Sequence, residues 1–401
     1  MHGRRSLALC IAAIFISAAP SLIAQRNNDN GKKPPQSTRS PQEQQDIQSL
    51  VQLVDNALAA DVGVPMTPPA GNSAPPAPPT PTTLSLGAPD RTQGDIKINW
   101  DQNHFVKGQT DTYIPFTLTL DRAKLAGGAA IYVRVVNVDQ AAAFGSAIAS
   151  LMAPAQGNKP NASVARPTFA WDNANFIDIP EGGSVSRAVQ LKPGQYVMYL
   201  AIKEKSAAPA GANQKNDRNN RNQPPAAGAP PATFGLLRHE LTVPDFTGPD
   251  LTTSSVIVAR SVDPVTAPPT DQESNPYVFG PMRIVPSPDG KFAKSAELSI
   301  IFWIYGAQAA ASGKPDVTID FNFHQKLPDG EKYFNKTSPQ QLNATTLPPE
   351  FSVAAGHQLP GSLVVPLSSF PAGDYRLEIK VTDKASGKSV TQNVNFTVLP
   401  V

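Results

Sequence analysis

The C-terminal part of the chain alternates between apolar and polar side chains. Apolar residues recur at every second position from Tyr375 to Val381, and charged residues lie between them. A second run with the same period, from Val390 to Val398, follows a polar stretch that contains Gly387. A period of two places alternate side chains on opposite faces of a strand. The pattern therefore predicts an antiparallel hairpin with one buried face.

A corner made of Pro and Gly precedes this hairpin, and a near-copy occurs earlier in the chain. Pro371-Ala372-Gly373 leads to Tyr375, and Pro193-Gly194 leads to Tyr196. Each corner turns tightly into a strand because Pro restricts φ and Gly tolerates positive φ. The motif resembles the tyrosine corner of immunoglobulin-like and fibronectin-III-like β-sandwiches. This resemblance implies that Tyr196 and Tyr375 have a structural role, with a buried ring and a hydroxyl bound to nearby backbone.

The repeated motif predicts an all-β fold with two tandem antiparallel β-sandwich domains, residues 84–245 and 246–401. Residues 206–232 contain no large apolar side chain, so we expect a disordered insertion at a hairpin tip of the first domain. Residues 139–154 are rich in Ala and predict a short helix. The second domain also resembles C-terminal β modules of exported bacterial proteins of uncharacterised function, which implies export and the fold but no activity.

Matching the two halves assigns faces to the strand expected at residues 298–305. The spacing from Phe105 to Phe116 equals the spacing from Phe292 to Trp303, so we expect Ile301, Trp303 and Tyr305 to face the core. The opposite face would then be apolar too, and it carries Leu298, Ile300, Phe302 and Ile304. An apolar outer face indicates a contact, either with the 306–316 loop, with the other domain or with a partner protein. These residues form a candidate interface.

The segments before the sandwiches differ from them in composition. Residues 1–24 join a basic start to an apolar run, which predicts a secretory signal peptide, with an uncleaved anchor as the alternative. Residues 25–40 are polar and expected to be disordered, and residues 63–83 are a Pro-rich linker. After signal cleavage no transmembrane span is expected. An exported protein, periplasmic or secreted, is the localisation that this order predicts.

Residues 41–62, between these segments, predict an amphipathic helix. Ser40 suits the N-cap position, and Glu43 completes a capping box. An apolar stripe that includes Leu50, Val54 and Leu58 runs along one face. We weigh two uses for the stripe: docking on the protein's own sandwich, or contact with a second copy or another envelope protein.

Composition and charge narrow the function further. The formal net charge of the 401-residue chain is +2, which provides no strong field for nucleic acid. Its one cysteine, Cys10, lies within the predicted signal peptide, so no disulfide is expected in the mature protein. The predicted sandwiches must therefore be stabilised by hydrophobic burial.

Motifs for catalysis or metal binding are not recognisable in the sequence. The four histidines after residue 24 are far apart, and each lacks a neighbouring His or Cys. Asp172, Asn173 and Asn175 offer oxygens that could suit Ca²⁺, but the spacing differs from an EF-hand and favours a polar turn. Asp250 to Ser254 superficially resembles the metal loop of von Willebrand A-like domains, and we expect an interdomain turn there. No cofactor, metal or catalytic residue is predicted.

The function that these observations favour is an exported, non-enzymatic binding or structural module of the cell envelope. β-Sandwiches present loops and strand edges to partners, and a linker extends their reach. The alternative is a carbohydrate-active or hydrolase-like exported enzyme, or its carbohydrate-binding accessory. Clustered carboxylates in a concave pocket would favour the alternative.

Overall fold

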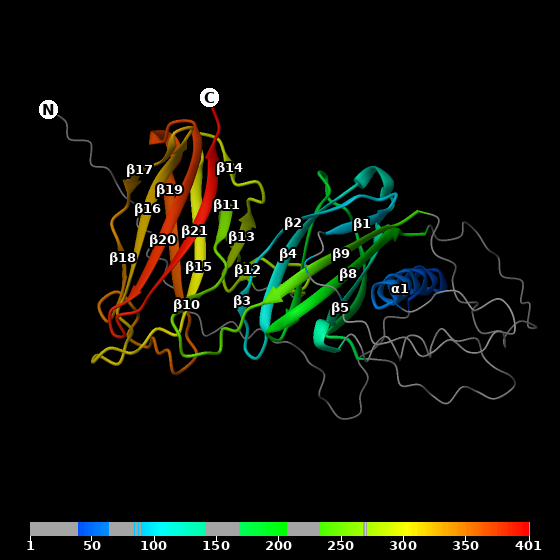
Figure 1. The fold of residues 1–401 in the computed structure, drawn as a ribbon, viewed down its shortest axis with the longest axis horizontal. Coiled ribbons are helices and arrows are strands. Elements are labelled where there is room, and N and C mark those ends of the chain that lie inside the picture. Colours follow the sequence, from blue (N-terminus) through cyan, green and yellow to red (C-terminus); the bar gives the residue numbers. More distant parts are fainter. Residues whose placement is uncertain are drawn as a thin grey trace, which may run out of the picture. The chain divides into compact units, whose positions relative to one another are not determined.

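The computed structural model describes residues 39–63, 84, 87, 90–140, 168–206, 233–267, 269 and 271–400. These residues form mainly antiparallel sheets and one α-helix, divided between two compact units (Figure 1). The first unit holds the described residues up to Thr247 together with residues 271–276, and the second holds the others from Gly248 onward. The all-β prediction with tandem sandwiches is confirmed. The predicted signal peptide, linker and insertion, and most of the predicted 139–154 helix, lie outside the described residues.

The first unit contains two facing sheets. One is five-stranded, in the order β1 (Arg91–Gly94), β9 (Gly235–Val243), β8 (Gly194–Glu204), β5 (Ala129–Asn137) and β6 (Trp171–Ile177). The other contains β2 (Ile98–Asn103), β4 (Thr112–Leu120), β3 (Val106–Lys107) and β7 (Ser184–Leu191). Short 3₁₀ turns follow β4 and β5 at Arg122–Lys124 and Val138–Gln140. Alternate side chains of both sheets form the core, among them Ile114, Phe116, Leu118, Met198, Leu200 and Ile202.

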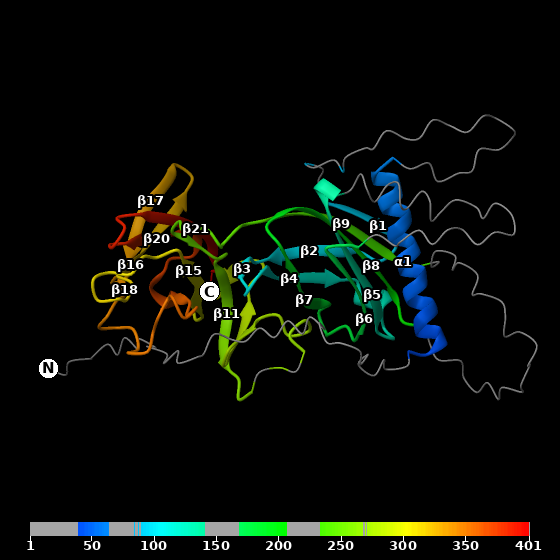
Figure 2. The same cartoon turned by 90° about the horizontal axis from the view of Figure 1, so that it is seen from below.

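Helix α1 (Pro41–Asp61) covers the outer face of the five-stranded sheet (Figure 2). It begins at the predicted capping box between Ser40 and Glu43. Leu50, Val54 and Leu58 are fully buried and belong to one cluster with side chains of β5 and β8. The apolar stripe therefore packs on the protein's own sandwich, and it is not exposed for self-association. No helix in the described ranges is long and apolar enough to cross a bilayer.

The second unit is also built from two sheets. One contains β10 (Thr252–Thr253), β15 (Glu297–Tyr305), β11 (Ile257–Pro264), β13 (Met282–Pro286) and β12 (Val278–Phe279), with β19 (Leu359–Pro366) paired to β15. The other contains β14 (Lys291–Phe292), β21 (Ser389–Val398), β20 (Gly373–Asp383), β16 (Val317–Leu327) and β17 (Gly330–Lys336), with β18 (Gln340–Leu342) paired to β16. A 3₁₀ turn, Leu367–Ser369, precedes β20. The predicted hairpin is confirmed, because β20 and β21 pair with Tyr375 opposite Phe396.

Both tyrosine corners have the predicted geometry. The Tyr196 hydroxyl donates to the Lys192 carbonyl at 2.9 Å, and the Tyr375 hydroxyl donates to the Pro371 carbonyl at 2.8 Å. Both rings are buried. Gly194 and Gly373 have φ of 149° and 146°, which a residue with a Cβ rarely adopts. The corner is therefore a structural feature of each sandwich, as the resemblance implied.

The prediction for β15 is wrong. Leu298, Ile300, Phe302 and Ile304 lie in the core of the second unit, each at most 2% exposed, so they form no outer interface. The error is in the matching of the two halves, because β3 pairs with β4 whereas β14 pairs with β21. The core-facing residues of β4 match the core-facing residues of β15 only when the assumed match is shifted by one residue. A shift of one residue moves every side chain of a strand to the other face.

Candidate functional site

Polar side chains occupy core-facing positions on two edge strands of the first unit. On β6, Asn173 and Asn175 alternate with Ala174, whose side chain packs in the cluster beneath α1. On β7, Arg187 lies between Val185 and Val189, which both belong to the core. Each of these strands pairs with a neighbour on one side only, and the two lie beside each other. They border a seam of the sandwich that polar groups line from both sides.

Glu273 fills this seam. The Asn173 side-chain amide donates to both carboxylate oxygens of Glu273, at 3.0 and 2.9 Å, and the Asn175 amide donates to one of them at 2.9 Å. The segment that carries Glu273 is also held at Pro276, whose carbonyl accepts a bond from the Tyr113 hydroxyl at 2.9 Å. We call the site formed by Trp171, Asn173, Asn175, Arg187 and Glu273 the seam pocket.

Burial controls the electrostatics of the seam pocket. It raises the pKa of Glu273, and repulsion from Asp271 adds to this, while Arg187 and the two amides oppose it. Burial lowers the pKa of Arg187, and Glu273 and Asp271 oppose that change. One terminal nitrogen of Arg187 donates to the Ser186 carbonyl at 2.8 Å, while its buried Nε has no hydrogen-bond partner among the described residues. The pocket therefore holds one carboxylate near a half-buried cation whose buried Nε–H has no hydrogen-bond partner among the described residues.

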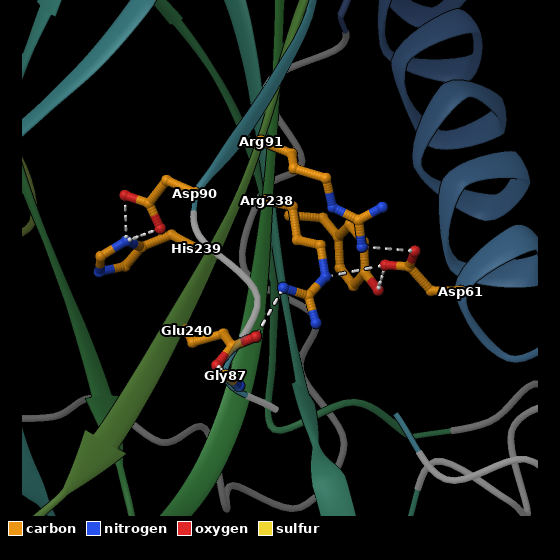
Figure 3. Close-up of polar contacts among 8 residues, drawn as sticks. Asp61, Gly87, Asp90, Arg91, Arg238, His239 and Glu240 are labelled. Carbon is orange, nitrogen blue, oxygen red and sulfur yellow. Dashed lines mark hydrogen bonds and ion pairs between the residues drawn. The ribbon is translucent and has the colours of Figure 1, made fainter. Parts of the chain in front are cut away.

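A second polar network joins the C-terminal end of α1 to the sheet beneath it (Figure 3). Asp61 accepts hydrogen bonds from the Tyr199 hydroxyl at 2.7 Å and from Arg238 Nε at 2.9 Å. Arg91 reaches the same carboxylate at 3.3 Å, and Arg238 also pairs with Glu240 at 2.8 Å. Because these groups satisfy one another, the network serves to dock the helix.

The same arrangement recurs along α1. Asp46 pairs with Lys203, and Asp55 pairs with Arg134. Asp46 also accepts bonds from the backbone and hydroxyl of Ser206, at 3.0 and 2.7 Å. Charged pairs thus accompany the apolar contacts, and they set the position of the helix on the sheet.

His239 lies on the other side of β9 from Arg238 (Figure 3). Its Nδ1 is 2.8 Å from Asp90, and Trp100 stacks on its ring with 3.8 Å between centroids. Burial lowers the pKa of His239, and Asp90 opposes this. The described parts of the chain contain no group of three or more His, Cys, Asp and Glu that could hold a metal ion.

Strand β17, at the edge of its sheet in the second unit, is exposed along almost its whole length. It pairs only with β16, and every residue is exposed except Phe334, which is half-buried. Tyr333 is 58% exposed, the highest value for a large hydrophobic side chain in the described ranges. The strand contains no proline, whereas the edge strand β19 contains Pro360 and Pro366. Among the described residues, the outer backbone edge of β17 has no strand partner, and it carries an exposed aromatic side chain.

The sequence interpretation missed the seam pocket. It treated Asp172 to Asn175 as a polar turn or a set of Ca²⁺ oxygens, but these residues form strand β6 and the two amides donate to Glu273. The sequence did contain a usable signal. Asn173, Asn175 and Arg187 are polar residues at positions where the alternation of a strand would place core side chains. The contribution of Glu273, from about 90 residues later in the chain, carried no local signal.

Comparisons with known proteins add little to this description. No family model and no curated protein matches the chain. Among solved structures, trypsin-activated alpha-2-macroglobulin from Escherichia coli is similar with a TM-score of 0.21 and 10% identity, over 78% of this chain and 17% of that one. Escherichia coli alpha-2-macroglobulin activated by porcine elastase has a TM-score of 0.18 and 11% identity, over 77% and 22%. The match spans a small part of those proteins, and at these scores it carries no functional argument.

Proposed function

We propose that this protein is an exported, non-catalytic binding module of the cell envelope that holds a partner protein at the edge of β17. The observation that carries the proposal is the exposure of this strand together with Tyr333. Export rests on the composition of residues 1–24, and the Pro-rich residues 63–83 are typical of a spacer in such proteins.

The chemistry of β17 suits addition of an extended segment. Unpaired backbone N–H and C=O groups at a sheet edge bind a further strand, and side chains then select the partner. Tyr333 supplies a large contact area, and its ring is supported edge-to-face by His324 at 5.9 Å between centroids. Antiparallel pairing of two copies about Phe334 would place Lys332 opposite Lys336, which opposes self-pairing in that register. We therefore expect a different protein as the partner, with acidic side chains near its contact.

A carbohydrate-active enzyme or accessory module is the weaker candidate. Glycoside hydrolysis requires two carboxylates about 5–10 Å apart in a cleft, and the residues lining the seam pocket include only Glu273 as a carboxylate. A sugar platform requires several exposed rings, and Tyr333 is the one exposed aromatic side chain among the large hydrophobic residues that the structure describes.

The proposal is tested by capture from envelope extract with the full mature chain. Tyr333→Ala is compared with wild type and with Val364→Ala, which changes a 46% exposed residue on another edge strand, β19. We expect Tyr333→Ala to lower the recovery of the captured protein by about tenfold, because Tyr is enriched among the residues that dominate interface energies and a tenfold change in affinity corresponds to about 1.4 kcal/mol. Val364→Ala should have no effect, and hydrogen exchange at residues 330–336 should slow in the complex. Equal recovery by all three proteins, or unchanged exchange, would refute the role of β17.

A further inference from the structure

We infer that the seam pocket is a carboxylate-binding site, occupied within the chain by Glu273 and open to the carboxylate of another ligand when residues 271–276 leave it. This site is separate from β17. Its ligand class is a carboxylate on a short flexible chain, either the side chain of an acidic peptide turn or a free small carboxylic acid.

The pocket has the features of a site built for an anion. Asn173, Asn175 and Arg187 stand at positions where the sandwich would otherwise bury apolar side chains. Polar groups in a core cost stability unless they are satisfied, so three of them converging from two strands need a polar occupant. The two amide groups donate three hydrogen bonds to one carboxylate. Arg187 adds positive charge, and its Nε has no hydrogen-bond partner in the described part of the chain.

The occupant belongs to a turn that contains several internal hydrogen bonds. The Ser274 N–H donates to the Asp271 carboxylate at 3.2 Å, and the Asn275 amide donates to the Asp271 carbonyl at 3.0 Å. Glu273 projects from this turn into the seam. No strand of the described residues pairs with 271–276, because β11 ends at Pro264 and β12 begins at Val278. Besides Glu273, the turn contacts the sandwich through Tyr113, which bonds the Pro276 carbonyl at 2.9 Å and the Gln272 side chain. A ligand that presents a carboxylate can replace Glu273 once these contacts open.

The donors select a carboxylate over a neutral amide. Both Asn173 and Asn175 present N–H groups to the occupant, so both of its oxygens act as acceptors. An amide would place its own NH₂ against one of these donors and would lose the attraction of Arg187. Trp171, Phe116 and Val189 provide apolar walls for the methylene groups beside the carboxylate.

Glu273→Ala in the full chain tests the inference by chemical rescue, because it removes one methylene and the carboxylate, the equivalent of acetate. We expect the variant to unfold at a lower temperature than wild type. Acetate should raise its midpoint with the logarithm of concentration, by about 2–5 °C at ten times its Kd. Acetamide should not raise it. Asp271→Ala, which keeps Glu273 and its amide donors, should show no response specific to acetate. A midpoint that responds equally to acetate and acetamide overturns the inference.

A peptide with the sequence of residues 269–277 distinguishes the two sources of carboxylate. Binding to Glu273→Ala, followed by Trp171 fluorescence in a Trp100→Phe, Trp303→Phe background, should be at least tenfold tighter than acetate if the ligand is an acidic turn. Equal affinities indicate a free carboxylic acid. The peptide with Gln in place of Glu should bind at least tenfold more weakly than the original. Loss of this discrimination would contradict carboxylate recognition.

Two further measurements keep the test decisive if Glu273→Ala does not fold. In the wild-type protein, excess peptide should accelerate hydrogen exchange of residues 271–276, because it competes with Glu273, and the Gln peptide should not. Glu273→Gln places an amide NH₂ against the same donors, so the original peptide should accelerate exchange of residues 271–276 in this variant at a lower concentration than in the wild type. Unchanged exchange in the wild type would refute the inference. Capture through β17 should be the same in Glu273→Gln and wild type, so failure here is distinguishable from failure of the proposed function.

Discussion

The tyrosine corner of the second unit allows a prediction in which the ring and the hydroxyl are separated. Tyr375 is fully buried, and its hydroxyl bonds the Pro371 carbonyl at 2.8 Å. Tyr375→Phe removes this hydrogen bond and leaves the ring in place. A typical net hydrogen bond contributes about 0.5–1.5 kcal/mol. We expect the lower half of that range because Pro371 is exposed, and water can satisfy its carbonyl in the variant.

Removal of the ring should cost considerably more. The Tyr375 ring stacks on Phe396 with 5.2 Å between centroids and meets Phe370 and Phe334 at 5.3 and 5.5 Å. Truncation of a buried aromatic side chain to Ala typically costs about 3–5 kcal/mol. Three aromatic neighbours lose their contacts at once, so we expect Tyr375→Ala to lie in the upper half of that range.

The assay is urea unfolding of the full chain followed by the fluorescence of Trp303, the one tryptophan of the second unit, in a background with Trp100→Phe and Trp171→Phe. Tyr333→Ala serves as a matched control, because Tyr333 is 58% exposed in the same unit and its loss should change stability by no more than about 0.5 kcal/mol. If Tyr375→Phe and Tyr375→Ala had equal and small effects, the ring would not be part of the core. If Tyr375→Phe cost as much as Tyr375→Ala, the separation of ring and hydroxyl would be wrong.

Two other predictions concern β15 and α1. Phe302→Lys should unfold the second unit, since it places a charge at a fully buried position, whereas Val364→Lys on the exposed edge of β19 should change stability by about 0.5 kcal/mol or less, as measured in the same urea assay. Asp46→Ala should cost the first unit about 3–5 kcal/mol because it removes the carboxylate partner of the half-buried Lys203 ammonium and leaves it only the Ser206 hydroxyl. Burial raises the pKa of the Asp46 carboxyl, but the bonds from Lys203 and Ser206 outweigh this and hold the pKa below its usual value. Asp46 therefore contributes stability above the unfolded pKa of about 3.9, and the difference between wild type and Asp46→Asn should shrink as the pH falls below about 4. A difference that persists to pH 2, by thermal unfolding, would contradict this assignment.

Local patterns predicted much of the scaffold. Alternation from Tyr375 to Val398 predicted the β20–β21 hairpin, and the repeated Pro and Gly corner predicted both tyrosine bonds. Ser40 and Glu43 predicted the first turn of α1. These features depend on residues within a few positions of one another, so the sequence contains the whole of their physical cause.

Features that depend on register were not predictable in the same way. The face of β15 was assigned by matching the segment that begins at Phe292 to the segment that begins at Phe105. The assignment was inverted because β14 pairs with β21 rather than with β15. Apolar residues occupy both faces of β15, so its own pattern did not correct the error. Strand register depends on the partner strand, and the partner is a property of the tertiary fold.

The sequence by itself determined the all-β class, the two corners, the helix and its cap, because propensity, periodicity and turn chemistry are local. Only the tertiary structure decided that α1 docks on its own sheet, that Phe302 is core, and that Glu273 enters the seam between Asn173 and Arg187. Each of these outcomes joins residues far apart in the chain. Their energies come from burial and from pairing of polar groups in a shared interior, and these act only once the strands have been brought together.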